Sequence, residues 1–456
     1  MCLLGLYLPL LCGLLFRITP IIIGCPDEKA DEKRAGIDHE IAKLEQKRAT
    51  ELLFFLELLI QKKDYARAAD QASRILLTPP TSSEDLARLK EALRDLALGF
   101  LRAEKAPRKA AELCESMAAR LGDDAILLYI ASLAYGKLGM QARQKEYEEK
   151  ARSVLSEDQE LWVKVGSFFA RREEWRTALE AFKAAAALSS DAPTHYNAKS
   201  ETALASIYCR LGDYEEALRH CKNLQEIARR IVVSRTSMAL LTTTVYTEKA
   251  RDAEIDERYD EAVEDYKKAA EFSPHPGAAY RSIGEQYLNL KKYGEAEKWF
   301  KRAVADGFPA AYAGLGDVRK ALGKPDEAEK EYAKCQKALD EQVKNNPDEA
   351  ANYNDLARFY ASHGKELDKG LDLAKRALEL APDSPEYLDT LAELYYRKGD
   401  REAAIREIKN AIALNPPHIK YYQKQLDRFQ KQKYEQKRVE VGESAPLRLH
   451  AFALKK

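Results

Sequence analysis

The sequence predicts an all-α protein built as an α-solenoid, a stack of about ten antiparallel helix pairs. Three observations support this fold class. Strong helix formers dominate, with only 21 Gly and 17 Pro in 456 residues. Apolar residues recur at helical spacing, i, i+3, i+4 and i+7. A motif also returns about every 34 residues from near residue 49 to residue 418, which is typical of repeat architectures.

The charge balance excludes one class of partner. Lys plus Arg and Asp plus Glu are equal at 74 each, so the formal net charge is zero. A neutral chain has no overall attraction for nucleic acid or an anionic membrane, and no nucleic-acid partner is expected. The end of the chain, 434–456, is more basic and is predicted to be a disordered, solvated tail.

Residues 1–24 are predicted to be a signal peptide or a membrane anchor. An apolar run fills residues 2–16, and the polar sequence PDEKADEKR begins at residue 26. The end of this segment, Ile22-Ile23-Gly24-Cys25, resembles a bacterial lipoprotein signal, which implies lipidation of Cys25. An uncleaved anchor, ordinary secretion and a wrongly assigned start codon remain alternatives. Residues 25–48 are predicted to be a charged linker with a leading helix.

The clearest copy of the repeated motif occupies residues 385–418. Its landmarks, in order, are Leu391, Ala392, Tyr395, Gly399, Asp400, Ala404, Ile408, Ala411 and Pro416. Related copies, each with an apolar–small pair followed by a second-helix Ala, cover 162–182, 280–300, 312–332 and 353–377.

This motif resembles the tetratricopeptide repeat, in which each unit is one helix pair. The resemblance implies a right-handed superhelix, a capping helix at 419–433, and the following units: 49–82, 91–124, 125–158, 159–192, 198–240, 243–276, 277–308, 309–349, 350–384 and 385–418. A small residue in the first helix, such as Gly284, is expected to let the second helix approach closely. Two second helices are expected to be longer than the rest, from Tyr214 to about Thr236 and from Pro325 to Asn345.

No catalytic, cofactor-binding or metal-binding motif is recognisable. The seven histidines are scattered, and none lies in a metal-ligand pattern. His220 and Cys221, with Cys209, form the one suggestive group. Because Cys221 occupies the position that Phe182 and Phe300 hold in sister units, we interpret the group as packing. The chain is therefore predicted not to be an enzyme and to need no cofactor.

The resemblance implies that the first helix of each unit lines a concave groove that holds a protein or peptide. The predicted groove residues are Arg251, Arg281, Glu285, Asn354, Arg358, Asp389 and Glu393. The equivalent positions upstream are apolar, namely Leu53, Ile126, Tyr129 and Leu133. Two alternatives stay open: the polar set is simply solvated, and the apolar set packs against a helix that starts near Ile37.

The expected function is a non-catalytic scaffold for protein–protein interaction, in the assembly of a cell-envelope complex. The alternative is a regulatory or adaptor subunit of a glycosyltransferase, of a peptidoglycan-active enzyme or of a secretion or pilus system. The expected location is the cell envelope, or the cytoplasm if the start codon is wrongly assigned. Chaperone-docking members of the family grip a carboxylate with a Lys/Asn/Arg set, which no adjacent units supply here.

Overall fold

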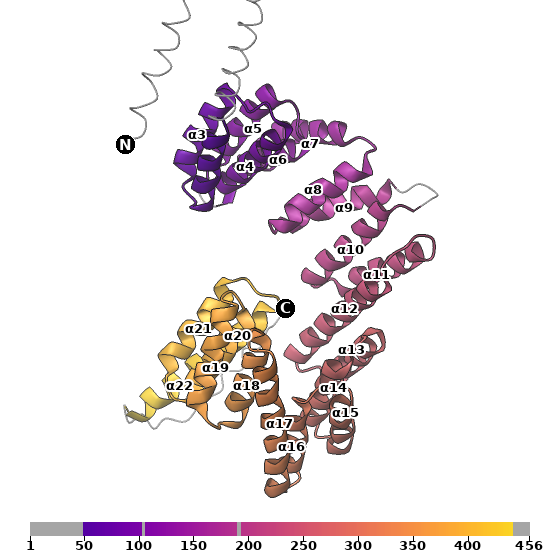
Figure 1. Ribbon diagram of the computed structural model, residues 1–456, viewed down its shortest axis with the longest axis vertical. Coiled ribbons are helices and arrows are strands. Elements are labelled where there is room, and N and C mark those ends of the chain that lie inside the picture. The colour runs from indigo at the N-terminus through magenta and orange to yellow at the C-terminus, as the bar shows by residue number, and fades with distance from the viewer. Residues whose placement is uncertain (1–48, 103–104, 189–192, 441–456) are drawn as a thin grey trace, which may run out of the picture. The chain divides into compact units, whose positions relative to one another are not determined.

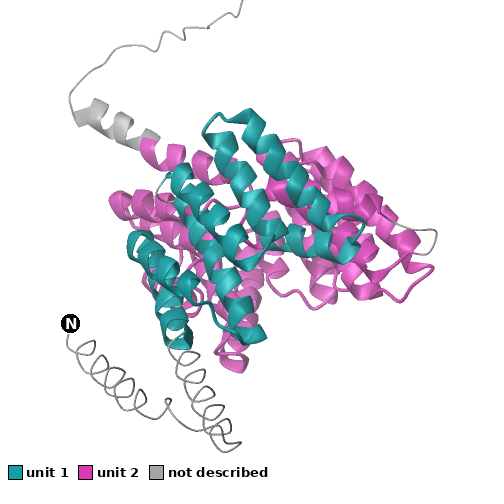
Figure 2. Cartoon of the chain, turned by 90° about the horizontal axis from the view of Figure 1, so that it is seen from above, with its two compact units in different colours: residues 1–168 teal, residues 169–456 magenta. Residues whose placement is uncertain are grey.

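The computed structural model describes residues 49–102, 105–188 and 193–440, with side chains through residue 430. These residues form helix pairs followed by one last helix, and no strand occurs among them. The chain divides into two compact units, Met1–Phe168 and Phe169–Lys456, here called unit 1 and unit 2 (Figure 2). The predicted all-α solenoid of about ten helix pairs is confirmed.

Unit 1 contains the first pairs of the array (Figure 1). Its helices are a helix over 49–61, α3 (Tyr65–Leu77), α4 (Ser83–Arg102), α5 (Pro107–Leu121), α6 (Ala125–Lys137), α7 (Gln141–Leu155) and most of α8 (Gln159–Arg171), which contains the unit boundary.

Unit 2 contains the remaining pairs and the last helix. Its helices after the boundary are α9 (Trp175–Ala187), α10 (His195–Arg210), α11 (Tyr214–Ala228), α12 (Arg235–Ile255), α13 (Tyr259–Phe272), α14 (Gly277–Asn289), α15 (Tyr293–Ala305), α16 (Ala311–Ala321), α17 (Pro325–Asn345), α18 (Ala350–His363), α19 (Leu367–Leu380), α20 (Pro385–Arg397), α21 (Arg401–Ala413) and α22 (Ile419–Glu440).

Small residues of the first helices meet large residues of the second helices. In the pair α14–α15, Gly284 faces the ring of Phe300, and a Cβ atom at Gly284 would lie 2.7 Å from that ring. Gly316 of α16 faces Tyr332 of α17 in the same way. Phe300 and Tyr332 are both buried. The close approach within a pair therefore depends on the missing side chain, as the sequence predicts.

In unit 1, α6 lies at the centre of the core. The consecutive residues Ile126, Leu127, Leu128 and Tyr129 point in different directions around this helix, yet all are buried. A helix that is apolar on every side must be covered on every side. Its neighbours include α4, α5 and α7, and the ring of Tyr129 packs against Trp162 of α8.

One predicted helix length is confirmed and one is wrong. The second helix α17 runs from Pro325 to Asn345 as predicted. In contrast, α11 ends at Ala228, and the long helix is the following first helix, α12. The β-branched run 231–233 disfavours helix, and the Ser234 hydroxyl then caps α12 by accepting a hydrogen bond from the Ser237 amide at 3.2 Å.

The last helix, α22, packs on α21 and covers the final apolar face. Its Tyr422 and Phe429 are buried together with Leu388, Ile408 and their neighbours. This is the role predicted for a capping helix. The helix continues to Glu440, past the predicted end at residue 433, because the sequence there is rich in Gln, Lys, Glu and Arg. Residues 441–456 of the predicted tail lie outside the described residues.

Candidate functional site

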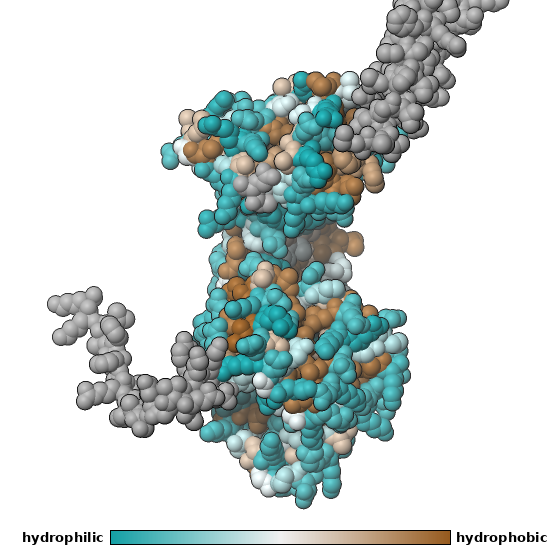
Figure 3. Space-filling model, turned by 90° about the vertical axis from the view of Figure 1, so that its left-hand side faces the viewer, coloured by the Kyte–Doolittle hydropathy of each residue, from teal (hydrophilic) through white to brown (hydrophobic). Residues whose placement is uncertain are grey.

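The first helices of unit 2 carry an ordered row of polar side chains. In α12, α14, α16, α18 and α20, one side chain of the row directly follows a buried small residue. In α14, α18 and α20 a second side chain of the row lies one helical turn earlier. Residues four apart share one face of a helix, so these side chains lie on one side of their helices, here called the first-helix face. Its described members are Arg251, Arg281, Glu285, Asp317, Asn354, Arg358, Asp389 and Glu393. Hydrophilic side chains predominate on the face of the molecule drawn in Figure 3, with hydrophobic patches between them.

Arg281 and Glu285 of α14 form an ion pair along the helix. Burial raises the pKa of Glu285, while the neighbouring Arg281 opposes that rise. The guanidinium of Arg281 also lies 5.8 Å from the centre of the Phe308 ring, a cation–π distance. The Nε atom of Arg281 is nevertheless buried without a hydrogen-bond partner. This donor is unpaired among the described residues.

Asn354 of α18 has an unpaired acceptor, whereas Arg281 has an unpaired donor. Only 8% of this residue is exposed, and its Oδ1 atom is buried without a hydrogen-bond partner. One turn later, Arg358 pairs with Asp355 at 3.0 Å, with 45% of its side chain exposed. The first-helix face therefore has a buried, unpaired acceptor one helical turn from an exposed cation.

Arg251 of α12 is the other accessible cation of the predicted set. It pairs with Glu248 at 3.2 Å and remains half exposed. The Oε2 atom of Glu248 also contacts His418, a residue that the sequence pattern does not single out.

The last two predicted residues are engaged by α22. Asp389 accepts a hydrogen bond from the Tyr421 hydroxyl at 2.8 Å. Burial raises the pKa of Asp389 to about 6, although the hydrogen bond from Tyr421 opposes the rise. Glu393 pairs with Arg397 at 2.7 Å and with Arg428 of α22. These two carboxylates hold the capping helix, and so they are less available to a partner than Arg281 or Arg358.

One member of the first-helix face was missed in the sequence. Asp317 follows Gly316 just as Glu285 follows Gly284, so the repeat register contained the signal. In the structure Asp317 accepts a hydrogen bond from the Tyr332 hydroxyl at 2.7 Å and lies 3.4 Å from His363 Nε2. It therefore ties α16 to its neighbours.

The predicted apolar half of the groove is not exposed. Leu53, Ile126 and Tyr129 are buried, and Leu133 is partly buried. The prediction that these positions line a groove is wrong, because they belong to the core of unit 1 and α6 is covered on all sides.

The group around His220 is a packed polar cluster. His220 Nδ1 lies 2.7 Å from Glu201 Oε2, and both residues are buried. Burial raises the pKa of Cys221, and it raises the pKa of Cys209 to about 12, so neither thiol is a ready nucleophile. Within the described ranges no His, Cys, Asp and Glu side chains are grouped in a way that suits a metal ion.

Cys25, the predicted lipidation site, lies outside the described residues. Among the described helices, none combines the length and the hydrophobicity needed to span a bilayer.

Comparison with known proteins points to one repeat family. Models of the tetratricopeptide repeat match residues 202–230, 247–314, 309–338 and 385–418. The chain is 24% identical over 251 residues to the Hsp70-Hsp90 organizing protein of Triticum aestivum, a match that covers 55% of this chain and 39% of that protein. It is 22% identical over 248 residues to Hsp70-Hsp90 organizing protein 2 of Arabidopsis thaliana, covering 54% and 39%. The chain thus spans about two fifths of the length of these curated relatives.

Solved structures give similar proteins as well. A tetratricopeptide repeat protein from Parabacteroides merdae is 17% identical with a TM-score of 0.36, and the match covers 59% of this chain and 98% of that one. A thermophilic TPR protein from Thermus thermophilus is 24% identical with a TM-score of 0.30, covering 40% and 98%. The helix pairs of the fold agree with the family matches, which show that the chain contains tetratricopeptide repeats in the matched segments.

Proposed function

We propose that the chain is a non-catalytic scaffold that holds an extended segment of a partner protein against the first-helix face of unit 2. One observation carries the proposal: this face contains a buried donor, Arg281 Nε, and a buried acceptor, Asn354 Oδ1, that have no hydrogen-bond partner among the described residues. A buried polar atom left unpaired costs about 1–3 kcal/mol, so a ligand that displaces the side chains covering both atoms and pairs them gains from them.

A peptide backbone has the matching groups. Its carbonyl oxygen accepts from Arg281, and its amide N–H donates to Asn354. The exposed Arg358 and Arg251 then add charge-assisted contacts to acidic side chains of the partner. Arg281 lies on α14 and Asn354 on α18, so a ligand that reaches both crosses α16 between them.

The experiment is a pull-down with the full chain from an extract of its source. The double variant Arg281→Glu, Arg358→Glu is expected to recover at least about tenfold less of the partner than wild type, since loss of central charged contacts costs about 2 kcal/mol or more. Lys301→Glu, Arg376→Glu is the matched control, because both residues are exposed on second helices, α15 and α19. Equal recovery with both double variants contradicts the proposal.

For the cellular setting, we propose assembly of a cell-envelope complex, with the chain attached through Cys25. The apolar run 2–16 and the Ile-Ile-Gly-Cys sequence support this. Wild type grown with a radiolabelled fatty acid is expected to carry label and Cys25→Ser to carry none. Label on Cys25→Ser eliminates the lipoprotein proposal. An adaptor for a glycosyltransferase, a peptidoglycan-active enzyme or a secretion or pilus system is the alternative.

The names of the curated relatives suggest a second candidate, docking of a chaperone. Arg281 and Arg358 are cations on the first-helix face that favour a carboxylate. The discriminating measurement is binding of one peptide with a free and with an amidated C-terminus. Chaperone docking through the C-terminus predicts that only the free carboxylate binds, whereas backbone recognition predicts equal binding.

A further inference from the structure

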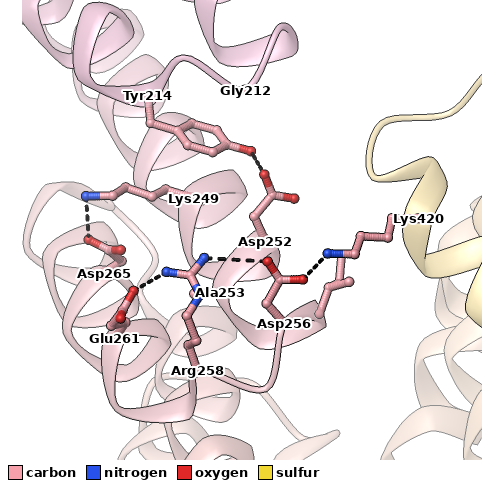
Figure 4. Close-up of a pocket in the computed structure, with 11 residues that line it drawn as sticks. Gly212, Tyr214, Lys249, Asp252, Ala253, Asp256, Arg258, Glu261, Asp265 and Lys420 are labelled. Atoms are coloured by element: carbon pink, nitrogen blue, oxygen red, sulfur yellow. Dashed lines mark hydrogen bonds and ion pairs between the residues drawn. The ribbon is translucent and has the colours of Figure 1, made fainter. Parts of the chain in front are cut away.

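The start of α22 contacts α12, which lies about 165 residues earlier in the chain but in the same unit. His418 sits between two carboxylates of α12: its Nε2 atom is 2.5 Å from Glu248 Oε2, and its Nδ1 atom is 2.5 Å from Asp252 Oδ1. Lys420 pairs with Asp256, and Lys424 donates to the backbone carbonyl of Ile255. Figure 4 shows Lys420 reaching from its own helix towards Asp256.

The acidic partners form a stripe on α12. Glu248, Asp252 and Asp256 are spaced four residues apart, so their side chains share one face of the helix. Like charges at this spacing repel each other and destabilise a helix by about 0.2–0.5 kcal/mol per pair. The cations of α22 remove that repulsion. Asp252 is further fixed by the Tyr214 hydroxyl, 2.5 Å from its Oδ2 atom (Figure 4).

The contact of His418 is more buried than that of Lys420, and it is therefore the stronger of the two. His418 is well covered, with 11% of its side chain exposed, and Glu248 has 20% exposed. Lys420 is 61% exposed, and such surface pairs contribute little on their own. His418 is therefore the main anchor.

The backbone just before α22 adopts an unfavourable conformation at His418. Asn415 and His418 have φ angles of 50° and 54°, in the left-handed region that residues other than glycine rarely adopt. Such a conformation is unfavourable and persists where other contacts compensate for it. The contacts of His418 with α12 give that compensation.

We propose that these residues form an ionic clasp that ties the two ends of the first-helix face together, and that the face becomes fully accessible to a partner when the clasp opens. The clasp is defined by His418, Lys420 and Lys424 with Glu248, Asp252, Asp256 and the Ile255 carbonyl. Along the chain, α12 precedes the helices that carry Arg281 and Asn354, and α22 follows the last pair. The claim that the clasp controls access to the face rests on the proposed function, whereas the claim that the clasp joins α12 and α22 does not.

The clasp is sensitive to pH. The groups facing His418 and its two carboxylates are Arg251 and Asp256 on α12, Tyr214 on α11, Cys209 on α10, and Lys420 and Tyr422 on α22. Burial lowers the pKa of His418, but the bonds to Glu248 and Asp252 outweigh burial and raise it overall. While the carboxylate partners are ionised, the clasp is therefore at full strength below about pH 6.5 and weakens as the pH rises through the raised pKa of His418.

The charged side chains of the adjoining pocket pair with one another. The pocket has a volume of about 350 Å³, and its lining includes Asp252, Asp256 and Lys420 of the clasp together with Lys249, Arg258, Glu261 and Asp265. Lys249 pairs with Asp265 and Arg258 with Glu261, so the charges of these four residues are satisfied within the chain (Figure 4).

Hydrogen–deuterium exchange on the full chain tests the closure without any partner. In His418→Gln, Lys420→Glu, amides of 248–258 are expected to exchange about tenfold faster than in wild type, because their local opening is no longer opposed. Amides of α16 are expected to be unchanged. Lys398→Glu is the matched control, since it breaks the pair with Asp368 elsewhere in unit 2. Exchange at 248–258 that equals wild type overturns the clasp.

Two further measurements guard against a variant that does not fold. In wild type, raising the salt from about 0.1 M to about 1 M shortens the screening length from about 10 Å to 3 Å and is expected to speed exchange at 248–258 more than in α16. Lys420→Glu places a carboxylate beside Asp256, so the added repulsion is expected to lower protection, and the charge swap Asp256→Lys, Lys420→Glu is expected to restore it. Salt-independent exchange, or a swap no better than the single variant, contradicts the proposal.

Access to the face is tested with p-hydroxyphenylglyoxal, a reagent specific for arginine. Arg281 is expected to be modified about threefold faster in His418→Gln, Lys420→Glu than in wild type, and Arg376 on α19 at the same rate in both. Faster exchange at 248–258 with unchanged modification of Arg281 overturns the claim that the clasp controls access to the face, but not the clasp itself. Neither result depends on the pull-down, so failure of the clasp and failure of the proposed function are distinguishable.

Discussion

At the scale of single residues, close packing within a pair depends on the match of a small and a large side chain. Gly284 and Phe300 are such a match, and Ala392 and Ile408 hold the same positions in the pair α20–α21. The larger residue in the first helix thus goes with the smaller one in the second. Volume is conserved across the contact rather than at either position.

Gly284→Ala is therefore expected to lower the free energy of unfolding by about 1–3 kcal/mol, because the new methyl group overlaps the Phe300 ring. Adding Phe300→Ile is expected to recover part of the loss. Urea denaturation of the two variants and of wild type measures both effects. A double variant less stable than Gly284→Ala would show that the match is not what sets the packing.

A second residue-scale prediction concerns Asp389. Its pKa is about 6 in the folded chain against 3.8 for an ordinary Asp, so the folded state holds its proton where the unfolded state has lost it. Wild type consequently loses stability as the pH rises from about 4 to 6. Asp389→Asn keeps an acceptor for Tyr421 and is expected to be about 1–2 kcal/mol more stable than wild type at pH 7.5. Thermal melting at pH 4 and pH 7.5 is the measurement; an equal difference at both values would contradict ionisation of the buried carboxyl as the cause.

The sequence predicts which residues occupy the first-helix face, because the repeat register alone assigns them. It does not predict their partners. Asp389 and Glu393 engage Tyr421 and Arg428, which belong to a helix without the repeat motif. Register fixes a side chain's face, whereas its partners depend on how the next helix packs.

At the scale of elements, the turns between paired helices need a left-handed residue. Gly399 has a φ angle of 87°, and Lys291 occupies the equivalent turn with a φ angle of 58°. Glycine adopts this conformation without the steric penalty that a Cβ atom brings.

Gly399→Ala is accordingly expected to destabilise the chain by about 1–2 kcal/mol, the energy of placing a Cβ atom in that region. Gly294→Ala is the matched control, because Gly294 lies within α15 with open space around it and no positive φ. The control is expected to gain about 0.5–1 kcal/mol. Urea denaturation measures both, and a loss in the control equal to that at Gly399 would disprove the conformational explanation.

Helix ends are predicted well where glycine or proline marks them. The second helices α13, α19 and α21 end shortly before Pro274, Pro382 and Pro416. The error at α11 and α12 arises where no such residue occurs, and the break is made by a β-branched run and the Ser234 cap. These signals are weaker than glycine or proline, and the predicted helix therefore runs past them.

At the scale of the whole molecule, the fold class follows from local patterns, because each pair contacts mainly its neighbours. Local patterns do not predict the division into two units, and they do not predict the contact between α12 and α22. The latter joins residues about 165 apart and depends on small rotations accumulated over several pairs. A motif of about 34 residues does not specify the total rotation over several pairs.

The most direct test of the central claim is site-specific photo-crosslinking in the source organism. A photoreactive amino acid at Arg358 on the first-helix face is expected to give a discrete adduct with one partner protein. The same amino acid at Arg376 on a second helix is expected to give none. An adduct at Arg376 without one at Arg358, or the same adducts from both positions, would contradict partner binding on the first-helix face.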